Sequence, residues 1–206
     1  DMLGSLCLYG KCAKYDSDEM APKYDDPDKT FINYHKEAVK WYRLAAEQGY
    51  AKAQFNLGLR YEYGTGIKQD YEKAVKWIEL AAEQGHVDAQ YHLGMVYKKG
   101  EIAKKDYKKA MKWFKLLIDY GYPQAQYHIG DMYENGLGVQ QSYKEAIKWY
   151  RLSVNQGGSS AKRKLGILYK NGQGVKQDRY KAFDLFKESC DAGNLGSCME
   201  LGEAYI

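Results

Sequence analysis

The chain has 206 residues, and its 31 lysines and arginines against 27 aspartates and glutamates give a formal net charge of +4. This length suits one elongated domain or two compact ones. So small a charge does not indicate a nucleic-acid-binding protein, which concentrates basic residues on one face. No apolar run in the sequence approaches the roughly 20 residues of a membrane-spanning helix.

The N-terminal segment predicts part of a helix pair with a long connection. LGSLCLYG at residues 3–10 keeps the leucine and glycine spacing of LGLRYEYG at residues 57–64, so we interpret it as the end of a first helix. We expect its partner helix at residues 35–48. The inserted loop between them, at residues 11–34, makes this connection 18 residues longer than the equivalent one later in the chain.

The inserted loop contains an acidic stretch, DSDEMAPKYDDPD at residues 16–28, with six acidic side chains. Its first four residues resemble the start of a calcium-binding loop. The stretch lacks the glycine at position six and the late glutamate that such a loop requires. We therefore interpret it as a solvated loop, and we leave open a contribution to a partner interface.

The sequence of the next stretch of the chain is repeated. AVKWYRLAAEQG at residues 38–49 returns as AVKWIELAAEQG at residues 74–85, 36 residues later. The same step aligns columns of alanine, glycine, leucine and tyrosine as far as the C-terminus. It also places all four tryptophans in one column: Trp41, Trp77, Trp113 and Trp149. A close copy at a fixed step indicates a stacked structural unit.

Each unit contains two helical patterns. In the first, Leu57 and Tyr61 fall on one face of a helix. In the second, the small and apolar residues within 74–81 follow the i, i+3, i+4, i+7 spacing of a core-facing stripe. Between them, Gly64 is suited to end the first helix and Asp70 to cap the second. One such pair cannot bury its apolar stripe alone, so the pattern predicts a solenoid of stacked pairs.

The pattern A-x-x-x-L-G-x-x-Y-x-x-G-x-G-V, followed by K-A-x-x-W-x-x-x-A-A-x-Q-G, resembles the Sel-1-like repeat family, relatives of the tetratricopeptide repeat. The resemblance covers about residues 34–206. It implies an all-α fold, a right-handed superhelical solenoid of antiparallel helix pairs. We expect one domain over residues 1–206, with incomplete repeats at both ends that suggest a longer natural protein. Its parts are a partial repeat at 1–49, full repeats at 50–85, 86–121, 122–157 and 158–193, and a partial repeat at 194–206.

No pattern in the sequence points to catalysis. His92 and His128 share one repeat column with Asn56 and Lys164, which makes them repeat positions rather than a site. No HExxH motif and no zinc-type spacing of histidine and cysteine occurs. The GTG, GLG and GQG turns lack the Lys-Ser/Thr of a phosphate-binding loop. We therefore expect a protein that is not an enzyme and has no cofactor or metal.

One column of the second helices is basic. It consists of Lys40, Lys76, Lys112 and Lys148, with glutamates nearby. We interpret this column as an exposed helix face whose charges pair with neighbours three or four residues away. It does not indicate binding to nucleic acid or to anionic lipid.

The cysteines suggest disulfides. Cys190 ends a second helix and Cys198 begins the next first helix, two positions that face each other across a tight turn, where a disulfide is geometrically reasonable. The stretch CDAGNLGSC also resembles the cysteine-rich secreted Sel-1-like proteins of epsilonproteobacteria, in which such pairs bridge adjacent helices. Cys7 and Cys12 could form a second, local bridge. Disulfides favour a periplasmic or secreted protein, and free thiols in a cytoplasmic protein are the alternative.

The resemblance also implies a binding face. Tetratricopeptide relatives line their concave face with the first helix of each pair, at the positions between the constant columns. These positions vary from copy to copy. In this sequence they are Lys52, Phe55, Leu59, Glu62, Tyr63, Asp88, Tyr91, Met95, Lys98, Lys99, Gln124, Tyr127, Asp131, Glu134, Asn135, Ser160, Arg163, Ile167, Lys170 and Asn171. Phe55, Tyr91 and Tyr127 are either exposed binding anchors or partly buried in the stack, and the sequence leaves both open.

The function implied by the resemblance is that of a bacterial scaffold or adaptor that binds a partner protein along this face, in the envelope or in host interaction. Two alternatives are an immunity protein that neutralises a secreted toxin and a protein that binds cell-wall glycan through its tyrosines. A β-lactamase-like enzyme is disfavoured, because the sequence has no S-x-x-K motif and no nucleophile elbow. We expect no nucleic-acid partner, no membrane insertion and a monomer, with end-to-end stacking of the solenoid left open.

Overall fold

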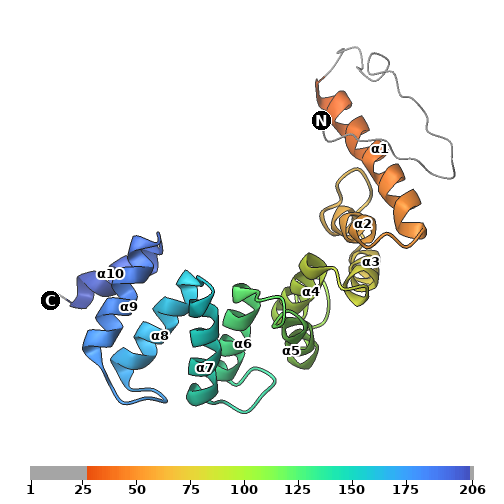
Figure 1. Cartoon of the computed structure of the whole chain (residues 1–206). Helices are drawn as coiled ribbons and strands as arrows, with labels where there is room; N and C mark the ends of the chain where they lie inside the picture. Colours follow the sequence, from red (N-terminus) through yellow and green to blue (C-terminus); the bar gives the residue numbers. More distant parts are fainter. Residues whose placement is uncertain (1–26, 205–206) are drawn as a thin grey trace.

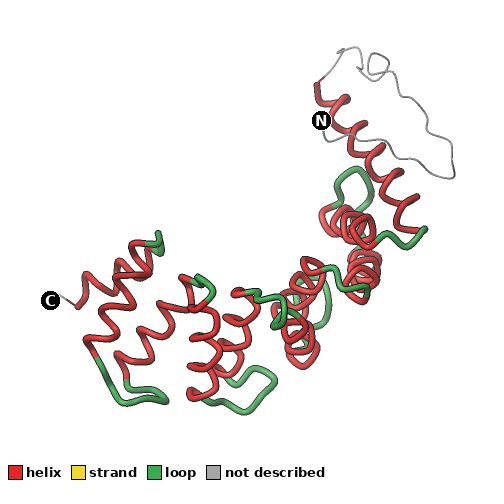
Figure 2. Tube along the Cα trace, viewed as in Figure 1, coloured by secondary structure: helices red, strands yellow, loops and turns green. Residues whose placement is uncertain are grey.

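The computed structural model describes residues 27–204, and this part of the chain consists of ten α-helices joined by short loops, with no strand (Figure 2). Successive helices pack as antiparallel pairs along an open arc, with α1 in one arm and α10 in the other (Figure 1). The all-α solenoid predicted from the repeat is confirmed. The helices are α1 (Pro27–Glu47), α2 (Ala51–Tyr63), α3 (Tyr71–Glu83), α4 (Val87–Lys99), α5 (Tyr107–Leu116), α6 (Pro123–Asn135), α7 (Tyr143–Asn155), α8 (Ser159–Asn171), α9 (Arg179–Asp191) and α10 (Leu195–Ala204).

The first described helix is longer than the sequence analysis predicts. Helix α1 begins at Pro27, so the prediction of a loop is wrong for residues 27–34. Proline is well suited to the first helical position, and neither glycine nor proline follows before Gly49, so nothing in the sequence stops the helix. The remainder of the predicted loop and the Cys7–Cys12 pair lie outside the described residues.

The helix ends repeat the same chemistry from copy to copy. Helix α2 ends at Gly64, which adopts a left-handed conformation with φ of 68° that favours glycine. Helix α3 starts at Asp70, whose carboxylate accepts a hydrogen bond from the Lys73 backbone N–H at 3.0 Å. The equivalent capping residues of the later second helices are Asp106, Ser142 and Asp178. The sequence therefore correctly predicts how the first helix of a pair ends at Gly64 and how the second begins at Asp70.

The glycine-rich turns bring neighbouring repeats into contact. Gly66 has a φ of +76°, and a Cβ atom there would lie 2.4 Å from the carbonyl carbon of His35 on α1. Gly138 and Gly174 approach Tyr107 and Tyr143 of the preceding pair in the same way. Glycine at these positions allows the turn to approach the helix before it, which accounts for the GTG, GLG and GQG sequences without a phosphate ligand.

The helices of each pair approach closely at a second column of glycines. A Cβ added to Gly94 on α4 would lie 2.4 Å from the Phe114 ring on α5, and one added to Gly130 on α6 would lie 2.7 Å from the Tyr150 ring on α7. Beside these glycines, Leu93 is fully buried. Large side chains on the second helix therefore fill the space that small ones on the first helix leave.

Candidate protein-binding site

The first helices of the pairs carry the residues that the sequence assigns to a binding face. In the view of Figure 1, α2 and α4 lie on the inner side of the arc, with α3 and α5 outside them. The assigned residues form an exposed group at the ends of the helices and a partly buried group between them. The exposed group is Lys52, Tyr63, Asp88, Lys99, Gln124, Asn135, Ser160 and Asn171. The partly buried group is Phe55, Leu59, Glu62, Tyr91, Met95, Lys98, Tyr127, Asp131, Glu134, Arg163, Ile167 and Lys170.

The aromatic residues of the partly buried group pack inside the stack, two of them against the next repeat and Tyr127 within its own helix pair. The Phe55 ring lies 5.0 Å from the ring of His86, at the start of the next pair. The Tyr91 ring lies 5.2 Å from the Tyr122 ring, again in the next pair. Tyr127 packs against His128 and Tyr150. Of the two interpretations left open by the sequence, partial burial in the stack is the correct one for all three rings. On the assigned face, Tyr63 is the exposed aromatic residue, with 66% of its surface accessible.

The polar residues of this group form a regular set of contacts between repeats, which we call the inter-repeat ladder. In each rung, the second-last residue of one first helix contacts a residue thirty positions later, on the next first helix. The four rungs join Glu62 to His92 at 2.6 Å, Lys98 to His128 at 3.1 Å, Glu134 to Lys164 at 3.1 Å and Lys170 to Glu200 at 3.1 Å. Each rung therefore ties two adjacent repeats together on the same side of the stack.

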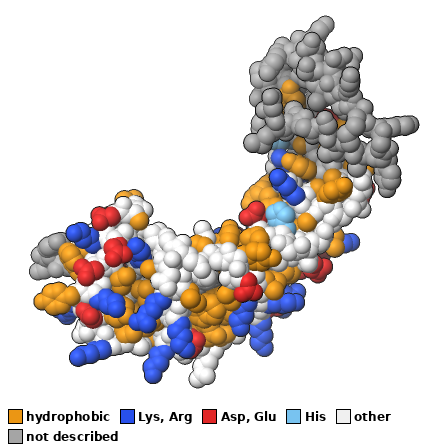
Figure 3. All heavy atoms as spheres, viewed as in Figure 1, with side chains coloured by type: hydrophobic (Ala, Val, Ile, Leu, Met, Phe, Trp, Pro, Cys, Tyr) orange, Lys and Arg blue, Asp and Glu red, His pale blue; other side chains and the backbone are white. Residues whose placement is uncertain are grey.

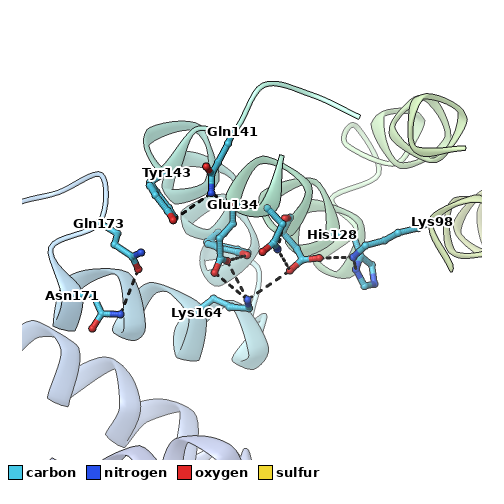
Figure 4. A network of polar contacts seen from close by, with 11 residues as sticks. Lys98, His128, Glu134, Gln141, Tyr143, Lys164, Asn171 and Gln173 are labelled. Carbon is cyan, nitrogen blue, oxygen red and sulfur yellow. Dashed lines mark hydrogen bonds and ion pairs between the residues drawn. The ribbon is translucent and has the colours of Figure 1, made fainter. Parts of the chain in front are cut away.

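The middle of the ladder is a continuous network (Figure 4). The Lys98 ammonium group donates to Asp131 at 2.6 Å, and Asp131 lies 3.6 Å from the Lys164 ammonium group. Lys164 continues to Glu134, which also accepts a hydrogen bond from the hydroxyl of Tyr150. Three successive first helices and one second helix are therefore connected through one set of charged side chains.

The network shifts the pKa values of its members. Burial, followed by the nearby Lys98 charge, lowers the pKa of His128 to about 4, so its imidazole is neutral near pH 7. Burial would raise the pKa of Asp131, but the hydrogen bond and charge of Lys98 outweigh it and lower that pKa. Burial likewise opposes the charge of Lys164, and the charge of Glu134 outweighs it and raises the Lys164 pKa. The lowered pKa of Asp131 and the raised pKa of Lys164 therefore favour the charged form of each.

The proton on His128 follows from these contacts. Its Nδ1 atom lies 3.1 Å from the Lys98 ammonium group, which can only donate, so Nδ1 is the acceptor. The proton of the neutral ring then lies on Nε2, which donates to the hydroxyl oxygen of Tyr91 at 3.2 Å. His128 thus joins a charged residue to a partly buried tyrosine.

The sequence analysis missed the ladder because it treated each column by itself. The column of Asn56, His92, His128 and Lys164 then shows only variation. The signal lies in a second column, six residues farther along in each copy, where acidic and basic residues alternate. Comparing each residue of that column with the one thirty positions later gives opposite charges at two rungs and a histidine at the other two.

A disulfide joins Cys190 on α9 to Cys198 on α10, with their Cα atoms 4.9 Å apart. Earlier copies make a hydrogen bond across the same eight-residue interval. Gln54 donates to the Ala46 carbonyl oxygen at 3.2 Å, and Gln90 donates to the Ala82 carbonyl oxygen at 3.0 Å. The disulfide therefore occupies the position of a polar clamp found in other repeats.

The described residues provide neither a metal site nor a membrane-spanning helix. Among the side chains that the structure describes, no group of three or more histidines, cysteines, aspartates and glutamates is arranged to hold a metal ion. Within residues 27–204, none of the helices is both long enough and apolar enough to cross a membrane.

Comparison with solved structures gives similar proteins of the same architecture. The chain is 39% identical to c5321, a protective antigen of uropathogenic Escherichia coli with an SLR fold, over 81% of this chain and 36% of that one, with a TM-score of 0.76. It is 37% identical to a Sel1 repeat protein from Oxalobacter formigenes, over 83% of this chain and 68% of that one, with a TM-score of 0.75. The chain thus spans about a third of the length of c5321.

A more distant structure supports the fold alone. Cysteine rich protein B of Helicobacter pylori is 21% identical over 66% of this chain and 97% of that one, with a TM-score of 0.51. The comparison with curated proteins gave no match. The family model for the Sel1 repeat matches residues 26–50, 51–86, 87–121, 123–158 and 159–194. These matches cover most of the sequence, and the chain belongs to the Sel1 repeat family.

Proposed function

We propose that this protein is a scaffold that binds a partner protein along the concave face formed by its first helices. Sel1 repeat proteins are generally interaction scaffolds and typically are not enzymes. The whole solenoid, with full repeats at residues 50–85, 86–121, 122–157 and 158–193, acts as the binding unit in this proposal. A disulfide between Cys190 and Cys198 favours a compartment outside the reducing cytoplasm, so we place this activity in the periplasm or outside the cell.

One observation carries the proposal: equivalent exposed positions on the binding face differ in chemistry from repeat to repeat. At the last position of successive first helices the chain has an aromatic, a basic and then two amide side chains, and at the second position it has four different ones. All are exposed: Tyr63, Lys99, Asn135 and Asn171 at the last position, and Lys52, Asp88, Gln124 and Ser160 at the second. The core columns beside them hardly change, since Leu57 and Leu93 are both fully buried leucines. A constant core with a changing surface gives each repeat a distinct contact for one extended partner.

The inter-repeat ladder supports this function by holding the face rigid. Lys98 and Asp131 connect adjacent first helices, and their side chains are only 14% and 18% exposed. A surface held in one arrangement loses little conformational entropy when it binds. The ladder and the packed rings thus form the backing of the surface, and the exposed residues at the helix ends form its contacts.

The experiment is a pull-down from native extract with mass spectrometry, followed by affinity measurement with the purified partner. The test variant is Tyr63→Ser, Lys99→Ser and Asn135→Ser, which changes exposed residues and leaves the packed rings intact. A matched control changes exposed residues of α9: Tyr180→Ser, Lys187→Ser and Asp191→Ser. We expect the first variant to weaken binding by at least about tenfold, and the second to leave it unchanged. Equal affinity of both variants for the partner would refute the concave face.

A further inference from the structure

Positive charge is concentrated on one segment around α5. Residues 104–115 contain six lysines and one aspartate, which gives this segment a charge of +5. The whole chain has a formal charge of only +4, so the rest of the molecule is close to neutral. The six residues are Lys104, Lys105, Lys108, Lys109, Lys112 and Lys115, and all of them are exposed. We call this set the α5 basic patch.

The repeat itself does not require this charge. The equivalent segment one copy earlier, residues 68–79, has three lysines and three acidic residues. Two of its glutamates, Glu72 and Glu79, correspond to Lys108 and Lys115 in the patch. Both sets occur in a second helix of the same repeat, α3 and α5, so forming this helix does not require the basic residues. The basic patch is therefore a property of this one copy.

Four lysines of the patch lie on the outer face of α5, and the other two lie in the loop just before it: Lys108, Lys109, Lys112 and Lys115 on the helix, and Lys104 and Lys105 in the loop. The opposite face of the helix packs into the core through Met111, Trp113 and Phe114, all of them buried. In Figure 1, α5 lies outside α4 on the arc, and Figure 3 shows Lys and Arg side chains along the lower edge of the molecule in this region. The patch and the proposed concave face thus belong to different sides of the same repeat.

These ammonium groups are not neutralised within the described chain. None of the six forms an ion pair there with a carboxylate, in contrast to Lys148, which contacts Glu145 on α7. Asp106, the one acidic residue inside the segment, caps α5 through the backbone N–H of Lys109. Within this segment, the mutual repulsion of six like charges is therefore opposed by the single carboxylate of Asp106 and by no ion pair.

Two large exposed side chains follow the patch along the chain, Leu116 at the end of α5 and Tyr120 in the turn after it. Leu116 follows Lys112 by one helical turn and is 44% exposed. Tyr120 follows Leu116 by four residues and is 61% exposed. Leu116 belongs to a leucine column that is exposed in the other copies as well, at Leu44, Leu80 and Leu152, whereas Tyr120 replaces a glutamine of those copies. The combination of closely spaced ammonium groups with an exposed leucine and an exposed tyrosine is therefore particular to this copy.

We infer that the outer face of α5 is a second docking surface, and that it binds an acidic polypeptide segment that also carries apolar side chains. Carboxylates of such a segment complement the patch, and its apolar side chains cover Leu116 and Tyr120. A phosphate backbone would match the charge alone. An anionic membrane surface needs a wider apolar face than Leu116 and Tyr120 supply, because the other apolar residues of α5 are buried in the core. The acidic polypeptide is therefore the occupant that uses every feature of the surface.

The test uses the full chain and a fluorescein-labelled peptide of sequence EELEELEELEEL, followed by fluorescence anisotropy at about 0.15 M salt. Lys108→Glu with Lys112→Glu and Lys115→Glu reverses the patch and leaves Lys109, which lies over the Tyr97 ring, in place. The matched control reverses three exposed lysines elsewhere, Lys68→Glu, Lys176→Glu and Lys187→Glu, with the same change in net charge. We expect the patch variant to weaken binding by at least about tenfold and the control by less than about twofold.

A second variant separates apolar contact from charge. Leu116→Ser with Tyr120→Ser keeps every lysine, and we expect it to weaken peptide binding by about threefold or more. Equal losses in the patch and control variants would show that only net charge matters and would overturn the inference. So would tighter binding of duplex DNA or phosphatidylserine vesicles than of the peptide. Circular dichroism of each variant verifies that it is folded. Unchanged peptide binding by the variant Tyr63→Ser, Lys99→Ser and Asn135→Ser would show that this surface is independent of the concave face.

Discussion

At the scale of single residues, His128 shows how the stack uses a position that varies between copies. It lies between the Lys98 ammonium group and the Tyr91 hydroxyl, and its ring stacks on Phe114 at 5.2 Å. A protonated imidazole in this place would bring a second positive charge next to Lys98, in a partly buried site. The neutral ring accepts from Lys98 and packs against aromatic neighbours. The residue therefore suits its position only in its uncharged form.

The depressed pKa of His128 predicts an acid-sensitive stack. In the unfolded chain the imidazole takes up its proton near pH 6.5, whereas in the folded protein it does so only near pH 4. As pH falls between these values the unfolded state binds more protons, so this group progressively lowers the free energy of unfolding, by at most about 3 kcal/mol. The lowered pKa of Asp131 acts in the same direction.

Urea denaturation at a series of pH values from 7 to 4 measures this effect. The loss of stability on acidification is expected to be smaller in His128→Gln, which cannot be protonated, than in the unchanged protein. An NMR titration of the His128 ring gives its pKa directly. A ring that titrates near the usual histidine value would show this explanation to be wrong.

At the scale of the helices, the close approach of the two helices of a pair depends on the absence of a Cβ atom at one glycine. In Gly94→Ala the new Cβ would overlap the Phe114 ring, and we expect a loss of about 1–3 kcal/mol in the free energy of unfolding. Gly202 on α10 occupies the same repeat column, but nothing lies within 4 Å of a Cβ added there. Gly202→Ala is thus the matched control, and we expect it to be neutral or stabilising by about 0.5–1 kcal/mol. Urea denaturation compares the two, and similar effects from both would contradict the close-packing argument.

The disulfide between α9 and α10 makes a second prediction at this scale. Replacing both cysteines with serine removes a short covalent loop, which we expect to cost about 2–3 kcal/mol of stability in α10. Cys190→Ala with Cys198→Gln recreates the alanine and glutamine of α3 and α4, and its hydrogen bond should recover about 1 kcal/mol. Amide hydrogen exchange of α10 is the measurement. No difference between the two double variants would show that the glutamine clamp does not transfer to this junction.

At the scale of the whole molecule, the sequence predicts the fold almost completely and the candidate site only in part. The fold is predictable because the core columns, such as Leu57 and Gly58, repeat without insertion and carry their own start and stop signals. The start of α1 could not be predicted because no Gly-x-Gly turn like GTG, GLG or GQG precedes this helix in the sequence. The burial of Phe55 and the rungs of the ladder could not be predicted from one copy, since both depend on where the next repeat lies. The α5 basic patch was hidden in a mild net charge averaged over the chain.

The ladder also predicts that whole repeats are not interchangeable. Deleting residues 122–157 would place Lys98 opposite Lys164, and deleting residues 158–193 would place Glu134 opposite Glu200. Deleting residues 86–121 would place Glu62 opposite His128, with no clash of charge. We expect the first two deletions to be less stable than the third by about 1–2 kcal/mol, because each leaves two like charges in one rung.

Thermal unfolding of the three deletion proteins, which have equal length, tests this order. Lys98→Glu in the first deletion, or Glu134→Lys in the second, restores an opposite-charge rung and should recover the loss. Three equal melting temperatures, or no recovery, would mean that the rungs do not distinguish one repeat from another.

A gene that encodes near-identical copies is prone to lose or gain one when unequal copies recombine, and the protein product of such an event usually keeps an intact hydrophobic core. Here the sign of the charge in the rungs differs between junctions, so each first helix is matched to the charge of its neighbour. Loss of residues 122–157 or of residues 158–193 would produce a chain that still packs but has two like charges facing each other at the new junction. The charged side chains of the ladder thus differ from one junction to the next. Chains that have lost either of these two copies are therefore expected to be less stable, although their repeated core would still pack.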